Sequence, residues 1–362
     1  MNVKGRWLGQ ALRDQQARRP RPRRLPEAVT RKLRCGRIVT LRYNVTGAMQ
    51  SNRLHERLAR GDVVILDGAT GTELERRGVP MDGQAWSATA TLTHPEVVRR
   101  VHEDYIRAGA DVVITNTFAT ARCHLEAAGL GERVGAVNRR AVELACEARD
   151  RAAAGREVWV AGSISTMAPG AEPARRPPVP RLSQMLAEQA DILARAGVDL
   201  LVLEMMRDVD YAAGAVDAAR ATGLPVWVGF SCRRTEEGVV KMFGGLREDL
   251  AFEEVIAPVM ARGGSLLAVM HTETADTGPA IEVAKRHWQG PLAAYPESGY
   301  FTMPSWQFVD VIPPEAFVAH AADWLRQGVQ VLGGCCGLGP EHIRLLRERL
   351  PANIGPPTAR RD

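Results

Sequence analysis

Two adjacent cysteines, Cys335 and Cys336, have the most distinctive chemistry in this chain of 362 residues. They lie in the stretch LGGCCGLGPEHI, between glycines and shortly before Pro340, a residue typical of the first turn of a helix. Cysteine thiolates bind zinc, and a catalytic zinc ion usually has three protein ligands and one open position. Free cysteines also pack as small apolar side chains, and a disulfide between neighbours would be strained. The pair therefore indicates a metal site, with buried inert thiols as the alternative interpretation.

The flanking glycines decide whether both sulfurs can reach one ion. In a regular strand, neighbouring side chains point to opposite faces, so two adjacent cysteines would diverge. Gly333, Gly334 and Gly337 allow backbone conformations that other residues rarely adopt. We therefore expect a strand to end at these glycines and both sulfurs to turn towards the same point.

The elements that must position the cysteines follow a repeating order. From residue 63 onward, short apolar runs rich in β-branched residues alternate with amphipathic stretches of helical period. Such apolar runs are typical of strands buried on both faces. They begin at residues 63, 111, 158, 200, 226, 266, 291 and 329. Eight strand–helix units predict an α/β fold of the (β/α)8 TIM barrel type rather than an open doubly wound sheet.

In a (β/α)8 barrel the active site forms at the C-terminal ends of the strands. Here the runs end in Asp67, Thr115, Ser163, Glu204, Cys232, His271, Tyr295 and the cysteine pair. Carboxylates, a histidine and three cysteines at one rim suggest a site. Glu204 is the most informative carboxylate, because an acid after DLLVL is costly in a core and must face the barrel mouth or a partner. Asp67-Gly68 and Thr115 are weaker, since a turn or a cap would explain them equally well.

Composition indicates an ordinary globular protein, with 45% hydrophobic and 25% charged residues. No apolar run is long enough for a membrane span, and the N-terminus lacks the apolar middle of a secretory signal. We therefore expect a cytoplasmic protein that binds no membrane. Six unevenly spread cysteines predict reduced thiols or metal ligands rather than a disulfide framework.

Charge divides the chain into two parts. Residues 1–43 carry 13 Lys or Arg against two acidic residues, so the whole-chain charge of +5 leaves a net −6 for the remainder. We expect residues 1–48 to be a basic, disordered extension, residues 49–351 to be the barrel, and residues 352–362 to be a flexible tail. The acidic remainder argues against a nucleic-acid partner.

The motifs resemble those of the homocysteine S-methyltransferase family, over residues from about 60 to 350. LDGATGTELERRG is similar to the family's first-strand motif, DVVITNTF to the second, DLLVLEMM to the fourth, and GGCCGLGPEHI to the last. The resemblance implies a barrel that binds zinc through Cys335, Cys336 and a third cysteine at the end of the sixth strand. It also implies that Asp67 and Glu204 hold the ammonium group of an amino-acid acceptor, with Gly68, Ala69 and Thr115 at the same end.

The chain departs from this family pattern at two places. The sixth strand reads LLAVMHTETAD, so Met270 and His271 stand where the family has Asn and the ligand Cys. We favour His271 as the third ligand, because it occupies the matching position and a Cys2His site is chemically ordinary. Cys232, at the end of the fifth strand, is the alternative third ligand. In YPESG, Glu297 replaces a family Asn.

The function implied by the resemblance is transfer of a methyl group from an activated donor to the thiol of homocysteine, giving methionine, or to a related thiol. Zinc would be the cofactor, and the partners would be a small thiol and a methyl donor. One alternative is a non-catalytic barrel that binds an amino acid or thiol. Another is a barrel lyase or hydrolase that uses His271 and Glu204 as acid and base. The long loop STMAPGAEPARRPPVPRLS is expected either to cover the barrel mouth or to be disordered.

Overall fold

The computed structural model describes residues 53–244, 247, 249–302 and 307–356. In this part of the chain eight parallel strands form one sheet in the order β1-β12-β9-β8-β5-β4-β3-β2. The strands are β1 Val64–Ile65, β2 Val112–Ile114, β3 Trp159–Ser165, β4 Leu200–Met206, β5 Val226–Phe230, β8 Leu266–Glu273, β9 Leu292–Glu297 and β12 Val331–Leu332. Each begins no more than two residues after the start of one of the eight predicted runs, and β3, β4 and β8 continue two residues beyond the end of theirs.

The first two strands close the sheet into a barrel. Leu66, just after β1, pairs in parallel with Val112 of β2. The backbone N–H of Asp67 donates to the Val112 carbonyl at 3.0 Å, and the N–H of Asp111 donates to the Ile65 carbonyl at 2.7 Å. Because β1 also pairs with β12, no edge strand remains in this sheet. The (β/α)8 prediction is therefore confirmed.

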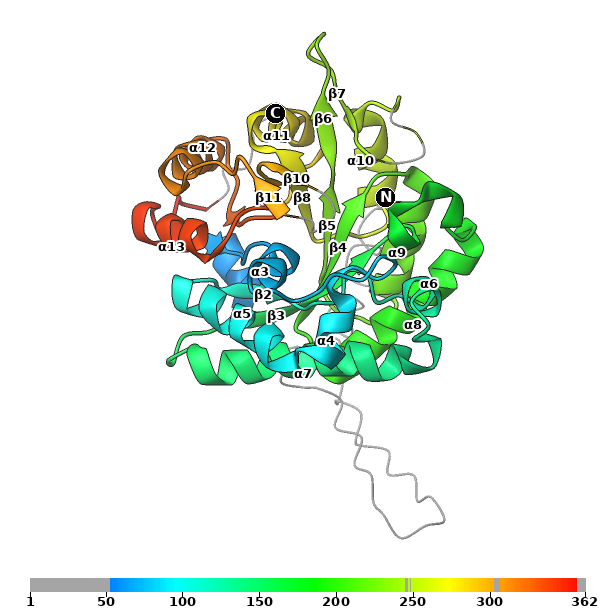
Figure 1. Ribbon diagram of the computed structural model, residues 1–362. Coiled ribbons are helices and arrows are strands. Elements are labelled where there is room, and N and C mark those ends of the chain that lie inside the picture. Colours follow the sequence, from blue (N-terminus) through cyan, green and yellow to red (C-terminus); the bar gives the residue numbers. More distant parts are fainter. Residues whose placement is uncertain (1–52, 245–246, 248, 303–306, 357–362) are drawn as a thin grey trace, which may run out of the picture. The chain divides into compact units, whose positions relative to one another are not determined.

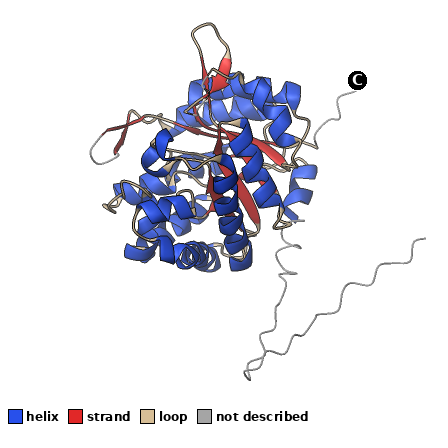
Figure 2. Ribbon diagram, turned by 90° about the vertical axis from the view of Figure 1, so that its right-hand side faces the viewer, coloured by secondary structure: helices blue, strands red, loops and turns tan. Residues whose placement is uncertain are grey.

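Helices surround the strands, as Figures 1 and 2 show. One helix follows each barrel strand: α5 Pro95–Ala108, α7 Val134–Ala152, α8 Val179–Ala196, α9 Val209–Arg220, α10 Phe252–Met260, α11 Thr274–His287, α12 Pro314–Arg326 and α13 Pro340–Arg349. Three shorter helices, α3 Thr70–Arg76, α4 Ala90–Thr93 and α6 Arg122–Ala127, lie in the loops after β1 and β2. None of the helices described is long and apolar enough to cross a membrane.

The apolar side chains of the strands divide between two cores. Val64 and Leu66 belong to a cluster inside the barrel that includes Trp159 and Trp227. Ile65 belongs instead to the larger cluster between strands and helices. This alternation along one strand is the expected consequence of opposite-facing side chains. It explains why the strands read as continuous apolar runs.

Two antiparallel hairpins interrupt the repeating order. The strands β6 Cys232–Arg234 and β7 Val240–Met242 follow β5, and their hairpin projects from the barrel in Figure 1. The strands β10 Tyr300–Thr302 and β11 Gln307–Val309 follow β9. Both hairpins leave from C-terminal strand ends, which is where a barrel builds its site.

The predicted extension over residues 1–48 lies outside the described residues. Residues 357–362 of the expected C-terminal tail also lie outside the described residues. The N–H of Val63 donates to the Ala352 carbonyl at 2.9 Å, and the N–H of Ile354 donates to the Gly61 carbonyl at 2.9 Å. Residues 352–354 are therefore tied to the start of β1 by backbone bonds.

Asp111 links the barrel closure to its helices, and we expect Asp111→Ala to lower the free energy of unfolding by about 2–4 kcal/mol. This buried carboxylate accepts from the N–H of Ile65 at 2.9 Å and pairs with Arg347. Alanine would leave the buried N–H without an acceptor. Urea unfolding measures the loss. Asp323→Ala, which removes an exposed pair with Arg326, should cost about 1 kcal/mol or less, and equal losses would contradict this role.

Candidate functional site: a Cys–Cys–His cluster at the barrel mouth

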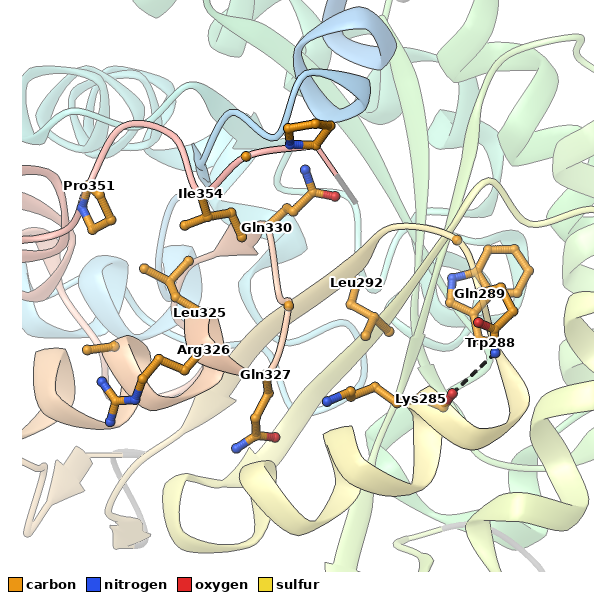
Figure 3. A pocket seen from close by; sticks show the side chains of 15 residues that line it. Lys285, Trp288, Gln289, Leu292, Leu325, Arg326, Gln327, Gln330, Pro351 and Ile354 are labelled. Atoms are coloured by element: carbon orange, nitrogen blue, oxygen red, sulfur yellow. Dashed lines mark hydrogen bonds between the residues drawn. The ribbon is translucent and has the colours of Figure 1, made fainter. Parts of the chain in front are cut away.

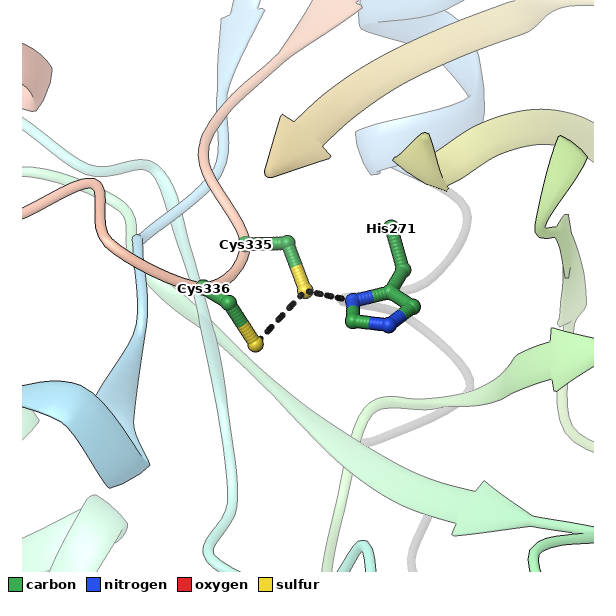
Figure 4. Close-up of side chains that lie close together, drawn as sticks. All are labelled: His271, Cys335 and Cys336. Carbon is green, nitrogen blue, oxygen red and sulfur yellow. Dashed lines mark hydrogen bonds between the residues drawn. The ribbon is translucent and has the colours of Figure 1, made fainter. Parts of the chain in front are cut away.

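The cysteine pair lies in a turn just beyond β12. The N–H of Cys335 donates to the Pro296 carbonyl at 2.7 Å, and the Cys336 carbonyl accepts from the N–H of Ser298 at 3.0 Å. These bonds hold the turn against the end of β9. The two sulfurs lie 3.9 Å apart as free thiols. Both point to the same side, as Figure 4 shows.

The three glycines contribute in different ways. Gly337 has a φ of +84°, which is the left-handed conformation that the sequence led us to expect. Gly333 and Gly334 are needed for space instead. A β-carbon at Gly333 would lie 2.6 Å from Cβ of Leu66, and one at Gly334 would lie 2.6 Å from Cβ of Leu338. The turn therefore depends on close packing as much as on backbone freedom.

His271 reaches the cysteines because β8 is irregular at its end. The pairing of β8 with β9 shifts register between Met270 and Glu273. His271 itself has a φ of +44°, a strained value for a residue with a side chain. A bulge of this kind re-aims a side chain at the end of a strand. It turns His271 towards the centre of the mouth, which simple strand alternation would not predict.

The described residues contain one group of histidine, cysteine and acidic side chains arranged to hold a metal ion, namely His271, Cys335 and Cys336. One ligand atom from each lies within 4.8 Å of the others, and Nδ1 of His271 lies 3.8 Å from Sγ of Cys335. Two sulfurs at about 2.3 Å from a tetrahedral zinc ion would be about 3.8 Å apart. The donor types and the separations of this group (Figure 4) therefore fit zinc.

Cys232 occupies a different place. Its side chain is fully buried in the core between strands and helices, among residues such as Val240 and Phe252. Burial raises the pKa of its thiol far above the usual range. It is not part of the group formed by His271 and the cysteine pair.

A carboxylate and a guanidinium surround His271. Oε2 of Glu297 lies 2.7 Å from Nδ1 of His271, and its other oxygen accepts from Arg233. Burial alone would lower the pKa of His271, but Cys335 and Glu297 outweigh it and raise that pKa to about 9. Burial raises the pKa of Glu297, yet His271 and Arg233 lower it overall. Without a metal ion, His271 and Glu297 therefore form a charged pair.

Two more carboxyl groups, Asp67 and Glu204, lie buried at the same end of the barrel. Oδ2 of Asp67 accepts from the N–H of Ile114 at 2.8 Å, and Glu204 accepts from the hydroxyl of Ser163. Burial raises the pKa of Glu204 to about 7. Burial, with the charge of Glu204 added, raises the pKa of Asp67 well above its usual range. Neither carboxyl group forms an ion pair with another described residue, and two such groups suit a positively charged ligand.

The remaining predicted site residues line the same region. Hydroxyl oxygens of Thr115 and Thr117 lie 2.7 Å apart, and the N–H of Ala69 donates to the Leu338 carbonyl at 3.0 Å. A β-carbon at Gly68 would lie 2.4 Å from that same carbonyl. All three predicted neighbours of Asp67 are therefore at the C-terminal strand ends.

Tyr295 joins the two halves of the site. Its buried hydroxyl has no hydrogen-bond partner among the described residues. Burial, followed by the charges of Glu204, Cys335 and Asp67, raises its pKa well above the usual range. The hydroxyl is thus near both the carboxyl groups and the cysteine pair, where it is available to a ligand.

The long loop after β3 is ordered. Its short 3-10 turns η3 Pro169–Ala171 and η4 Pro173–Arg175 are held by several contacts. The N–H of Gly170 donates to the Gln84 carbonyl at 3.1 Å, and Arg176 forms a buried ion pair with Asp208 at 2.5 Å. The loop therefore packs against the segment before α4 and the start of α9, and the disordered alternative is wrong.

A separate cavity of about 750 Å³ lies at the other end of the barrel (Figure 3). It is lined by Leu292 and Gln330, at the N-terminal ends of β9 and β12, and by Lys285 of α11. In (β/α)8 barrels this end serves stability and the opposite end serves catalysis. The cavity is therefore distinct from the cysteine site.

Sequence reasoning missed two functional contacts. Arg233 carried no signal, because its role depends on the β6–β7 hairpin bringing it to Glu297. The hairpin itself had a signal, since Gly238 separates two short stretches of strand-forming residues and has a φ of +86°. Ser163 was recognised as a strand end, but its bond to Glu204 depends on the register between β3 and β4.

The chain is a closed (β/α)8 barrel whose mouth carries two cysteines and a histidine that could hold a metal ion, an arrangement typical of a barrel enzyme. Residues 64–350 match the family described as homocysteine S-methyltransferase. The chain belongs to this family and is a methyltransferase of that kind.

Similar proteins support this assignment. A homocysteine S-methyltransferase of Escherichia coli K12 is 29% identical over 327 residues, covering 83% of this chain and 99% of that protein. A selenocysteine Se-methyltransferase of Brassica oleracea var. italica is 29% identical over 318 residues, covering 80% and 89%. The metallated crystal structure of the homocysteine methyltransferase MmuM from Escherichia coli superposes with a TM-score of 0.69 at 26% identity, covering 83% and 100%.

Glu204→Gln should stabilise the fold most at neutral and alkaline pH. The pKa of Glu204 is raised from 4.5 to about 7 in the native state. Between these two pH values the native state keeps a proton that the unfolded state has released, so the free energy of unfolding falls as the pH rises. Glutamine avoids that loss, which is on the order of 3 kcal/mol. Urea unfolding of the metal-free protein at pH 5 and pH 8 measures the difference.

Ser163→Ala is the matched variant for this measurement. It removes a hydrogen bond that lowers the pKa of Glu204, so the loss of stability should extend to higher pH. A wild-type protein and a Glu204→Gln protein with the same pH dependence would refute the buried-charge argument.

Proposed function

We propose that this protein is a zinc-dependent methyltransferase that transfers a methyl group from an activated donor to the thiol of homocysteine, giving methionine. The observation that carries the proposal is the group of Cys335, Cys336 and His271 beside a buried pair of carboxyl groups. The first set suits a thiol, and the second suits the ammonium group of an amino acid. Family membership supplies the reaction class.

Cys335, Cys336 and His271 would hold the zinc ion. When bound, zinc lowers the pKa of a coordinated thiol, so that a thiolate nucleophile is available at neutral pH. The turn after β12 and the bulge in β8 fix where the three side chains meet. By holding the zinc ion, the three side chains would place the acceptor sulfur at one point of the barrel mouth.

The other end of the acceptor would be held by Asp67 and Glu204. Their pKa values are raised because both carboxyl groups are buried. An ammonium group would stabilise their charged forms. Gly68, Ala69 and Thr115 line the same end. The Tyr295 hydroxyl, which has no hydrogen-bond partner among the described residues, is near both the carboxyl groups and Cys335.

Purified wild-type protein supplied with zinc should contain about one zinc ion per chain and convert homocysteine to methionine with one of the sulfonium or ammonium methyl donors. S-methylmethionine, S-adenosylmethionine and betaine are the donors to test. Cys335→Ala and His271→Ala should lose zinc and turnover together. Mass spectrometry measures both the metal and the methionine.

Cys232→Ala is the control for the metal measurement, because this buried cysteine lies outside the proposed ligand group. It should keep its zinc. If Cys232→Ala loses zinc and His271→Ala keeps it, the third ligand is Cys232 and not His271. A wild-type protein without zinc would remove the basis of the mechanism.

The ammonium role predicts a substrate-dependent effect of Glu204→Gln. With homocysteine, kcat/KM should fall about 10²–10³-fold, because a buried charge-assisted contact is lost. With 4-sulfanylbutanoate, which lacks the amino group, the variant and wild type should differ little. Equal losses with both acceptors would assign Glu204 a structural role instead.

A further inference from the structure

Tyr295 reaches across the inside of the barrel. Its side chain extends from β9 into the interior cluster that includes Trp159 and Trp227, and the residue is only 2% exposed. A β-carbon built on Gly229 of β5 would lie 2.7 Å from the Tyr295 hydroxyl oxygen. Because β8 lies between β9 and β5 in the sheet, the ring extends past its neighbouring strand and places its hydroxyl against β5.

The residues around this hydroxyl give it no hydrogen bond. The hydroxyl is a buried polar atom without a partner among the described residues. Met270, which pairs with Tyr295 between β8 and β9, has its Cγ 2.8 Å from the same point beside Gly229. The sulfur of Met270 already accepts from the N–H of Met205 at 3.2 Å. The Leu203 carbonyl lies 3.1 Å from that point, yet no hydrogen bond joins it to the hydroxyl.

An unpaired buried hydroxyl lowers the stability of the ligand-free protein. Its hydrogen bonds to water are lost on folding and are not replaced, which costs free energy. Phenylalanine would fill almost the same volume without this cost. A hydroxyl of this kind at the mouth of a barrel is therefore expected where a ligand supplies the missing partner.

The charges near the hydroxyl indicate which part of a ligand it meets. Glu204 exerts the largest of them, followed by Cys335 and Asp67, and together with burial they raise the pKa of Tyr295 well above its usual range. The hydroxyl therefore stays neutral, and its oxygen can accept a hydrogen bond from a cation. Leu203, whose carbonyl borders the same space, directly precedes Glu204 in β4. The hydroxyl thus belongs to the end of the site that suits a positive charge.

An ammonium group between Asp67 and Glu204 needs a third acceptor. It carries three N–H donors, and the two carboxylates account for two of them. In a buried space the remaining N–H would be left unpaired at a cost. The hydroxyls of Thr115 and Ser163 at this end already have partners. The hydroxyl of Tyr295 has none among the described residues, so its oxygen is available.

We propose that Tyr295 binds the amino group of the acceptor: its hydroxyl oxygen accepts the third hydrogen bond of the ammonium group held by Asp67 and Glu204. The inference rests on the proposed function, because it assigns a further contact to the same amino-acid acceptor. It makes Tyr295 a residue that distinguishes thiols with an amino group from thiols without one. The free protein keeps this contact ready at a loss of stability.

Tyr295→Phe removes only the hydroxyl and tests the contact by ligand binding. In the zinc-supplied full-length protein, the Kd of homocysteine should rise about 10–100-fold, because a hydrogen bond to a charged group is lost. The Kd of 4-sulfanylbutanoate, which keeps the thiol and the carboxylate but lacks the amino group, should change less than about threefold. Isothermal titration calorimetry measures both constants.

Tyr295→Phe should also raise the melting temperature of the ligand-free protein by about 2–4 °C, because an unpaired buried hydroxyl is removed. Tyr105→Phe is the matched control for this measurement. Tyr105 is equally buried, but its hydroxyl donates to the Leu338 carbonyl at 3.3 Å, so its removal should lower the melting temperature. Differential scanning calorimetry measures both variants. A purely structural hydroxyl at residue 295 would not combine a higher melting temperature with weaker homocysteine binding.

The outcomes separate this inference from the proposed function. Wild-type protein that binds neither acceptor overturns both. Wild-type protein that binds homocysteine, with the Kd unchanged in Tyr295→Phe or raised equally for the two acceptors, overturns the role of Tyr295 alone. A lower melting temperature of Tyr295→Phe also overturns that role, because the hydroxyl would then have a structural partner. A loss of affinity confined to homocysteine, together with a higher melting temperature, establishes the contact.

Discussion

Closure of the parallel sheet is the constraint on which the rest of this structure depends. Backbone hydrogen bonds join residues 65–67 to residues 111–112 and so close the sheet between β1 and β2. On its other side β1 pairs with β12, which pairs in turn with β9. Only in that arrangement do the N–H of Gly334 and the N–H of Cys335 meet the carbonyls of Asp67 and Pro296. The cysteine pair is thereby set between the carboxyl groups on one side and Glu297 on the other. The site is a product of the order of the strands, not of any single loop.

The sequence predicted those elements that are encoded by a short continuous stretch of residues. Eight apolar runs predicted the strands, and the residues at their ends predicted the side chains at the mouth, except Cys232, which lies in the core between strands and helices. What it did not contain was register at the strand ends. The shifts in β4 between Leu203 and Met206 and in β8 between Met270 and Glu273 depend on neighbouring strands. For the same reason the contacts of Arg233 with Glu297 and of Ser163 with Glu204 had no signature along the chain.

A third thiolate and a neutral imidazole differ in charge as well as in shape. Two thiolates and an imidazole neutralise a divalent cation, whereas three thiolates leave a net negative charge. Glu297 places a negative charge directly on the imidazole, and Arg233 balances it further out. In the proposed zinc site, the electron density on an acceptor sulfur would therefore depend on His271, Glu297 and Arg233 together. In such a site, the reactivity required of the methyl donor would depend on which residue is the third metal ligand.

The buried carboxyl groups also make ligand capture a proton-exchange event. Glu204, with a pKa of about 7, is partly protonated at neutral pH, and the raised pKa of Asp67 acts in the same direction. In the proposed binding mode, the ammonium group of the acceptor would displace these protons into the buffer. The heat of acceptor binding would then contain the ionisation enthalpy of the buffer, and acidification would weaken acceptor binding even where the thiol end is unaffected.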